Sequence, residues 1–238
     1  MADLGCKFIS GDVADDASVD IALDKAEEAH GVARILVNCA GVAPGAKTVG
    51  NNNIPHSLET YRKTIEVNLI GTFDVISKVA ARAVATTEIK GERGVIVNTS
   101  SVVAFDGQIG QAAFATSNSG VAGMTLPVAR DLAQHKIREI MVAPGIFLTP
   151  MLKSPHSRFR HARHTGPHPS RLGRPEEYGQ LVEAIVRNPM LNGEVIRLDG
   201  PIPMAPRWGF SQGEWYRARN RWIRRPDCPR LWGFPQLG

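Results

Sequence analysis

Short apolar runs alternate with helix-like segments along most of this 238-residue chain, and this alternation constrains the fold more than any other feature. Runs such as ARILVNCAG, GVIVNTS and IREIMVAPG are rich in apolar and β-branched residues. Such runs are typical of parallel strands that helices cover on both faces. Strands that alternate with helices form βαβ units, so the sequence predicts an α/β fold with a parallel sheet.

The pattern also predicts where the elements lie. A first strand, CKFISGDV, is expected to end at Asp12, and a helix should follow with Ser18 as its N-cap and Gly31 as its stop. Ser57 is a candidate cap for a long helix. The remaining elements are expected as helices over 57–87 and 111–134 and as strands over 33–41, 94–100, 137–145 and 193–200.

Ligands of such sheets bind beyond the carboxyl ends of the strands. The segments at these ends are Asp12, Asn38 to Gly41, Thr99 to Ser101 and Pro144 to Phe147. Phe114 and Asn118 follow on the next helix, four residues apart and therefore on one face. The sequence predicts a binding site where these segments meet.

Composition limits the class of protein. Hydrophobic residues make up 43% and charged residues 21%, which is ordinary for a globular chain. No run approaches the length of a membrane helix, and the N-terminus lacks the basic start and apolar stretch of a signal peptide. The cysteines, at 6, 39 and 228, form no pair with metal-ligand spacing. We expect a cytoplasmic protein with reduced thiols, no metal site and no membrane contact.

Two segments depart from the alternating pattern. Residues 153–171 contain four His, several Arg and no acid, and we expect an irregular loop there. From Arg207 to the end of the chain, seven Arg and two acidic residues leave a local charge of +5, equal to the net charge of the whole chain. All four Trp also lie in 207–238. This basic tail could bind nucleic acid through Arg and Trp, although a charge run is usually a solvated surface.

The chain resembles the short-chain dehydrogenase/reductase family, and more narrowly type II 3-hydroxyacyl-CoA dehydrogenases, over about residues 4–152 and 167–206. The resemblance is carried by the segments VNCAG, IEVNLIGTF, RGVIVNTSSVVAFDGQIGQAAF, GMTLPVARDLA, APGIFLTPML, PSRLG and NPMLNGEVIRLDG. It implies a Rossmann-like parallel sheet, an NAD cofactor and a substrate that is an acyl-CoA or another secondary alcohol.

The resemblance also implies a catalytic set of Asn, Ser, Tyr and Lys. In that family Tyr transfers the proton, Lys lowers the Tyr pKa and binds the nicotinamide ribose, Ser binds the substrate oxygen, and Asn holds a relay water. The matching positions are Asn68, Ser101, Phe114 for Tyr and Asn118 for Lys. Phe has no hydroxyl and Asn no charge, so the resemblance predicts a protein with little or no turnover. With its partners replaced, Ser101 could equally be a strand-end cap.

The cofactor half is predicted to be incomplete as well. The family opens with a strand and a Gly-rich turn that places pyrophosphate on a helix N-terminus. That pattern is not found here, and MADLGCKFISGDV matches the approach to the family's third strand. We therefore expect a sheet that lacks the family's first two strands. By resemblance, the cofactor would contact Asp12, Val13, Asn38, Cys39, Ala40, Gly41, Pro144, Gly145, Phe147 and Thr149.

Loss of two strands would leave an exposed apolar edge. Three outcomes follow: CKFISGDV pairs beside the next strand, another chain covers the edge, or the domain is unstable. We divide the chain into an incomplete dehydrogenase domain, 1–206, and the tail, 207–238, and expect a homo-oligomer. Besides an active dehydrogenase, the open alternatives are a non-catalytic partner of active paralogues, a decayed or out-of-frame gene product, and a weak nucleic-acid binder.

Overall fold

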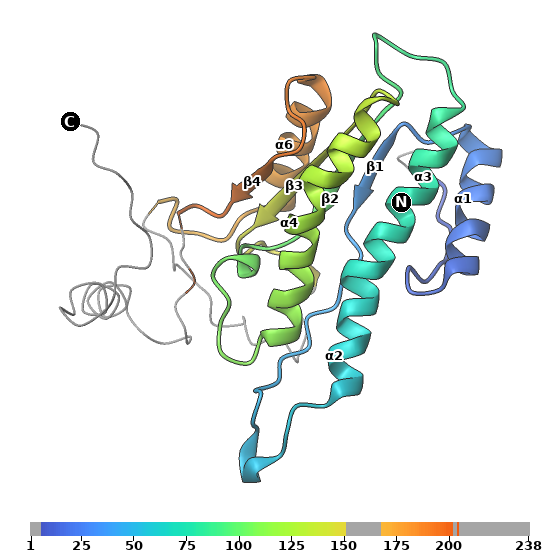
Figure 1. Cartoon of the computed structure of the whole chain (residues 1–238). Coiled ribbons are helices and arrows are strands. Elements are labelled where there is room, and N and C mark those ends of the chain that lie inside the picture. The colour runs from blue at the N-terminus through green and yellow to red at the C-terminus, as the bar shows by residue number, and fades with distance from the viewer. Residues whose placement is uncertain (1–5, 151–167, 202–203, 205–238) are drawn as a thin grey trace, which may run out of the picture.

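The computed structural model describes residues 6–150, 168–201 and 204. Its centre is a four-stranded parallel sheet in which the strands follow chain order, β1-β2-β3-β4 (Figure 1). The predicted α/β fold with a parallel sheet is confirmed. The strands are β1 (Ile35–Asn38), β2 (Gly94–Thr99), β3 (Ile137–Pro144) and β4 (Val195–Leu198).

Helices pack on both faces of the sheet (Figure 1). One face carries α3 and α4, with α1 against the outer side of α3; α6 covers the other face. The sequence pattern did not predict α6. The bounds are α1 (Asp16–His30), α2 (Leu58–Ile65), α3 (Gly71–Val84), α4 (Ala112–Ala133) and α6 (Pro175–Arg187), with short 3₁₀ turns η2 (Asn51–Asn53) and η4 (Val102–Ala104).

The core has a layer on each side of the sheet, because side chains alternate along a strand. Beneath α3 and α4, the cluster consists of Ile76, Ala80, Ala83, Ile96, Val128 and Ile137. Beneath α6, it consists of Val95, Val97, Ile140, Val142 and Ile185. β2 and β3 contribute to both layers and are buried along their length, which explains the apolar run in β2 and the mostly apolar composition of β3, where Arg138 and Glu139 are the charged residues.

The first helix begins differently from the prediction. Asp15, not Ser18, is the N-cap of α1, because its Oδ1 accepts from the N–H groups of Ala17 and Ser18 at 3.1 and 3.3 Å. The hydroxyl oxygen of Ser18 instead accepts from the Asp12 N–H at 2.9 Å. The predicted stop is confirmed: Gly31 follows α1 with φ 75°, a backbone conformation that favours glycine.

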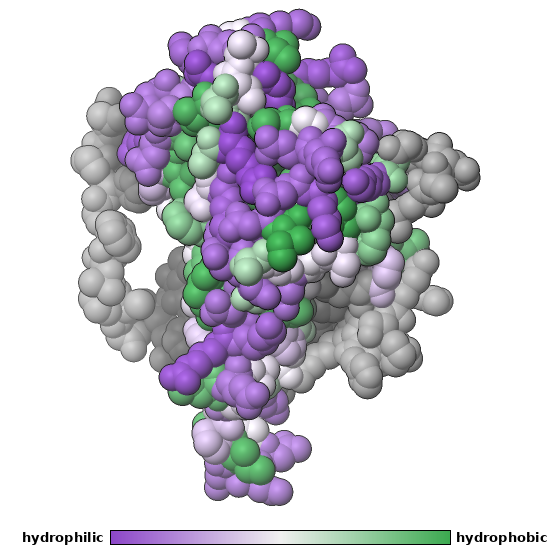
Figure 2. Space-filling view, turned by 90° about the vertical axis from the view of Figure 1, so that its right-hand side faces the viewer, coloured by the Kyte–Doolittle hydropathy of each residue, from purple (hydrophilic) through white to green (hydrophobic). Residues whose placement is uncertain are grey.

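Charged side chains attach α1 to α3. The Lys78 ammonium lies 2.7 Å from Asp16 and 2.9 Å from Asp20, and Arg82 pairs with Asp24 at 2.6 Å. Figure 2 shows that hydrophilic residues predominate on this side of the molecule. These contacts raise the pKa of Lys78, against the opposing effect of burial. Ion pairs therefore supplement the few apolar contacts made by α1, whose one buried side chain is Val19.

The expected first strand is wrong. Residues 6–12 form no strand in the structure and pair with none of the four strands. A strand needs a neighbour for its backbone groups, and none of the described residues provides one there. Of the three expected outcomes, pairing of CKFISGDV with β1 is excluded. β1 is the edge strand, and its apolar side chains Ile35 and Val37 are 52% and 37% exposed.

The predicted long helix over 57–87 is divided and ends earlier. Its Ser57 cap is confirmed, since the hydroxyl accepts from the Thr60 N–H at 3.2 Å. A π-helical turn, η3 (Glu66–Ile70), separates α2 from α3. Gly71 opens α3 directly against the Val13 carbonyl, where a Cβ would lie 2.5 Å from the oxygen. The bulge and the glycine together let the 12–15 segment approach the helix.

Two sequence predictions fall largely outside the described residues. Of the expected loop 153–171, only 168–171 is described, and it has no regular secondary structure apart from bends. The tail 207–238 lies wholly outside. Within the described part of the chain, no helix has both the length and the apolar character needed to cross a bilayer.

Candidate active-site region at the carboxyl end of the sheet

The carboxyl end of β1 is tied to the centre of the sheet by side chains. Asn38 Nδ2 donates to Asn98 Oδ1 at 2.9 Å, and Asn98 Nδ2 donates to Glu139 Oε1 at 2.7 Å. Asn98 and Glu139 are fully buried. Asn38 was predicted as a cofactor contact, yet its amide nitrogen is already engaged with its neighbour in the sheet.

A second polar cluster lies on the α6 side of the same strand ends. Cys39 Sγ lies 3.2 Å from Thr99 Oγ1, which lies 2.6 Å from the Tyr178 hydroxyl. Burial raises the pKa of Tyr178, so this hydroxyl stays protonated near neutral pH. Tyr178 was missed at the sequence level because α6 itself was missed.

Asn68 holds the segment that follows β1. Its Oδ1 accepts from the Val42 N–H at 2.8 Å, and its Nδ2 donates to the Val42 carbonyl at 2.9 Å and to Ser117 Oγ at 3.1 Å. Gly41 lies against it, since a Cβ there would be 3.4 Å from Asn68 Oδ1. Asn68, expected in a proton relay, is here a buried clamp between the 39–42 segment and α4.

Two more residues of the expected catalytic set, Asn118 and Ser101, have side chains that are hydrogen-bonded within the protein, and Phe114 is partly buried. Asn118 is 5% exposed; its Oδ1 accepts from Ser100 Oγ at 3.0 Å, and its Nδ2 donates to the Phe114 carbonyl at 2.7 Å. Ser101 Oγ accepts from the Val103 N–H at 3.2 Å and is the N-cap of η4. No hydrogen bond joins Ser101 to Asn68, Phe114 or Asn118, all of which are described residues. The geometry of Ser101 is therefore that of a strand-end cap.

The ends of β3 and β4 meet beside these residues. Pro144 ends β3, and the next N–H, from Gly145, donates to the Leu198 carbonyl at 2.9 Å. A Cβ on Gly145 would lie 2.8 Å from the Asp199 Cβ, so this crossing requires glycine. Further along, Phe147 packs on Gly173, where a Cβ would be 2.7 Å from the ring.

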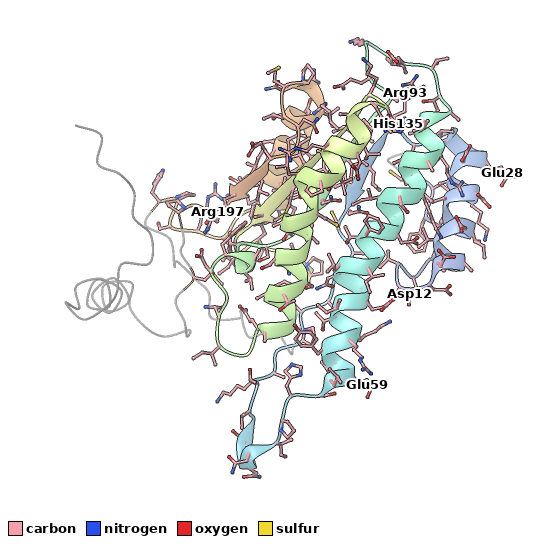
Figure 3. All side chains as sticks on the ribbon, in the orientation of Figure 1. Asp12, Glu28, Glu59, Arg93, His135 and Arg197 are labelled. Carbon is pink, nitrogen blue, oxygen red and sulfur yellow. The ribbon has the colours of Figure 1, made fainter. Side chains whose placement is uncertain are left out.

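The other predicted contacts lie around this edge. The Thr149 N–H donates to the Phe147 carbonyl at 2.9 Å. Asp12 and Val13 lie in the turn before α1, where Asp12 Oδ1 accepts from the Ala14 N–H at 2.9 Å (Figure 3). Cys39 and Ala40 are exposed. The structure therefore places the predicted cofactor contacts at the carboxyl edge, whereas Arg93 and His135 lie together at the opposite end (Figure 3).

Glu139 is a fully buried acidic residue in this region. Burial raises its pKa to about 8, although the hydrogen bond from Asn98 opposes the shift. Its second oxygen, Oε2, is buried and has no hydrogen-bond partner among the described residues. Sequence analysis did not select it, but there was a signal: it is an acidic residue in the middle of the run IREIMVAPG.

The described residues fit a dinucleotide only in part. The strand ends form an edge of the expected kind, but diphosphate binding needs free N–H groups at a helix start. At α1 two first-turn N–H groups bond to the Asp15 carboxylate, at α2 one bonds to Ser57, and at α6 the N–H of the N-cap residue Arg174 bonds to Glu177, whereas the start of α4 has no side-chain cap. None of the described helices follows a Gly-rich turn of the pattern G-x-x-x-G-x-G. No group of three His, Cys, Asp or Glu in the described ranges is placed to hold a metal.

Comparisons with known proteins agree with this architecture. The family model for short chain dehydrogenase matches residues 3–158. The 3-hydroxyacyl-CoA dehydrogenase type-2 of Bos taurus is 48% identical over 204 residues, which are 84% of this chain and 78% of the relative. The protein of the same name from Drosophila melanogaster is 48% identical over 203 residues, 84% and 79% of the two chains.

A solved structure agrees as well. The crystal structure of 3-hydroxyacyl-CoA dehydrogenase type-2 from Mycobacterium avium matches with a TM-score of 0.78 and 35% identity, over 87% of this chain and 81% of that one. The sheet, the helices on its two faces and the segments at its carboxyl edge thus have counterparts in sequence and in structure. The chain belongs to the short-chain dehydrogenase family.

Proposed function

We propose that this protein is a 3-hydroxyacyl-CoA dehydrogenase-like member of the family that has little or no catalytic turnover. The relatives' names support the substrate class, and NAD is the cofactor that the resemblance implies. The observation that carries the loss of activity is the state of Asn118. Its amide is buried between Ser100 and Phe114, so it presents no charge to a ribose or to a neighbouring hydroxyl.

The proton transfer has no evident replacement at this position. Phe114 supplies a ring without a hydroxyl, and a missing acid/base group costs on the order of 10²- to 10⁴-fold in rate. Both described tyrosines have hydroxyls that are already hydrogen-bonded: Tyr61 donates to Thr116 Oγ1 at 3.0 Å, and the Tyr178 hydroxyl lies 2.6 Å from Thr99 Oγ1. The Tyr178 hydroxyl lies on the α6 side, and its raised pKa disfavours the deprotonated form that would be needed to accept a proton from an alcohol.

Turnover measurements test this proposal. The purified chain should show no oxidation of a 3-hydroxyacyl-CoA by NAD above a buffer control, measured by NADH absorbance. The bovine relative, assayed in parallel, shows that the reagents work. Because none of the described helices follows a Gly-rich turn that would bind a diphosphate, Phe114→Tyr with Asn118→Lys should remain far below that relative. Clear turnover by the unmodified chain would refute the proposal, and relative-like turnover by the double variant would refute the account of the cofactor site.

A second function, that of a non-catalytic structural partner, has its own observation. Apolar side chains are exposed along α2, α3 and α4, including Leu58, Ile70, Phe73 and Leu126. Such side chains on adjacent elements are typical of association surfaces. Binding to active paralogues would use this surface; the test is co-purification of the tagged chain with a co-expressed type-2 dehydrogenase, lost when Phe73 is changed to Asp.

A further inference from the structure

A line of side chains crosses three strands on the α3–α4 face of the sheet. Asn38 in β1 donates to Asn98 in β2, and Asn98 donates to Glu139 in β3, at 2.9 and 2.7 Å. We call these three residues the amide–carboxyl ladder. It runs from the exposed edge strand to the interior, and its outer member directly precedes the 39–42 segment at the candidate site.

The inner end of the ladder lies in apolar surroundings. Ile137 and Met141 flank Glu139 on the same face of β3, and each belongs to an apolar cluster beneath the helices. Glu139 itself is fully buried, with a donor to one oxygen and none to the other among the described residues. An ionised carboxylate with a single donor is very costly in such a place, whereas a neutral carboxyl costs much less, because it leaves one polar group unpaired but buries no charge.

Among the described residues, no charged side chain compensates Glu139 from the elements around it. Ile96 and Asn98 of β2 are uncharged. The titratable residues of α4, Arg130 and Asp131, are exposed, as is Glu194 before β4. The charged residues of the remaining elements are paired with other groups. Arg138, next to Glu139, pairs with Glu92. On α3, Asp74 pairs with Lys78, and Lys78 and Arg82 pair with carboxylates of α1.

We propose that Glu139 is a positioning residue that works in its uncharged form: it accepts the Asn98 amide, orients the ladder, and thereby holds the Asn38 side chain and the start of the 39–42 segment. The orientation of the Asn98 side-chain amide follows from its hydrogen bond to Glu139. The oxygen that faces Asn98 accepts, so Asn98 must direct its NH₂ inward and its oxygen toward Asn38. The proposal concerns the folded chain alone and does not require NAD to bind.

The ladder makes the protein sensitive to pH in a definite direction. The folded-state pKa of Glu139, about 8, is above its ordinary value of 4.5. Between these values the unfolded chain has lost this proton and the folded chain retains it. Stability therefore falls as pH rises through the window from 4.5 to about 8, and the contribution of Glu139 is constant above it.

The test uses the full chain and compares Glu139→Gln with Glu139→Leu. Thermal unfolding from pH 5 to pH 9 is followed by circular dichroism, and the side-chain NH₂ signals of Asn38 and Asn98 by ¹⁵N–¹H NMR. Gln keeps an acceptor for Asn98 and cannot ionise. It should preserve both NH₂ signals, raise the midpoint at pH 7.5, and lose that advantage near pH 5. Leu removes the acceptor, so both signals should shift.

Glu194→Gln, at an exposed carboxyl, is the matched control and should leave the pH profile unchanged. The proposal is overturned if Glu139→Gln has the same pH profile as the unmodified chain. It is also overturned if Glu139→Leu folds and leaves the Asn38 and Asn98 signals in place. Should Glu139→Leu fail to fold, the Gln variant still decides, because both its pH profile and its NH₂ signals are specified in advance.

Discussion

At the scale of single residues, Asn118 stands where the family has a charged Lys, and its side chain forms hydrogen bonds within the protein instead. Its side chain accepts from Ser100 Oγ and donates to the carbonyl of Phe114, so it ties the end of β2 to the first turns of α4. A family Lys at this position would have to leave the pocket that Asn118 fills. The Asn118 side chain is therefore part of the packing of the domain, and its removal should lower the free energy of unfolding.

We predict that Asn118→Ala destabilises the fold by about 1–3 kcal/mol, because it leaves buried partners without their bonds. In a double-mutant cycle with Ser100→Ala, the coupling should be about 0.5–1.5 kcal/mol. Urea denaturation of the four proteins measures both quantities. A coupling of zero would mean that the Ser100–Asn118 bond does not contribute to stability.

Sequence reasoning identified the residues of the site but not their bonds. Ser101 and Asn118 were selected from their positions at a strand end and on a helix, and Asn68 from the family resemblance alone. Their hydrogen bonds, to Val42, Val103 and Ser100, join segments far apart in sequence or depend on the local backbone. Spacing along the chain carries no information about such partners, so the inward orientation of Asn118 could not be predicted.

At the scale of elements, the four strands of the sheet and their parallel direction were predictable, whereas the strand expected over CKFISGDV did not form, and neither α6 nor the interruption of the long helix was foreseen. β2 and β3 are buried on both faces, so composition alone marks them. Asp15 and Ser18 are both good N-cap residues, and the choice depends on the turn at Asp12. The π turn η3 depends on the approach of the 12–15 segment, which no local pattern encodes.

A substitution at Gly71 tests whether the close approach of the 12–15 segment to α3 matters for stability. It has an ordinary helical φ of −61°, so its role is steric: an added Cβ would lie 2.5 Å from the Val13 carbonyl oxygen. We predict that Gly71→Ala destabilises the protein by about 1–3 kcal/mol, despite the better helix propensity of Ala. The matched control is Gly123→Ala in α4, where no atom lies within 4 Å of the added Cβ.

Gly123→Ala should stabilise the protein by about 0.5–1 kcal/mol, because only the helix propensity changes. Chemical denaturation of both variants gives the comparison. If both glycines responded alike, the close contact between Val13 and α3 would not constrain the fold, and the bulge at η3 would need another explanation.

At the scale of the whole molecule, the sheet is covered unevenly. β4 and β3 are sheltered by α4 and α6, whereas β1 presents a free edge with Ile35 and Val37 exposed. The other apolar surface runs along α2, α3 and α4. The parallel direction of the strands followed from the alternating pattern, but which surfaces stay exposed depends on how the layers pack together, and the sequence pattern does not determine that packing.

These surfaces lead to a last prediction, that the protein self-associates through its helices. The family resemblance implies pairing through the two helices that correspond here to α2–α3 and α4, and both are present in this chain, the first with the π turn η3 inside it. Ile70 and Phe73 are 49% and 52% exposed, one turn apart on the same helical face. A surface of this kind can be self-complementary about a two-fold axis, and burial of each large apolar side chain contributes roughly 1.5–3 kcal/mol.

Light scattering on the eluting full-length chain should therefore show an oligomer at micromolar concentration, and Phe73→Asp should shift it toward monomer. Met190→Asp, at an exposed residue in the turn after α6, serves as the control and should not change the mass. A chain truncated after Pro206 should retain the helix-mediated association. Full-length and truncated chains that are both strictly monomeric would show that neither helical surface associates.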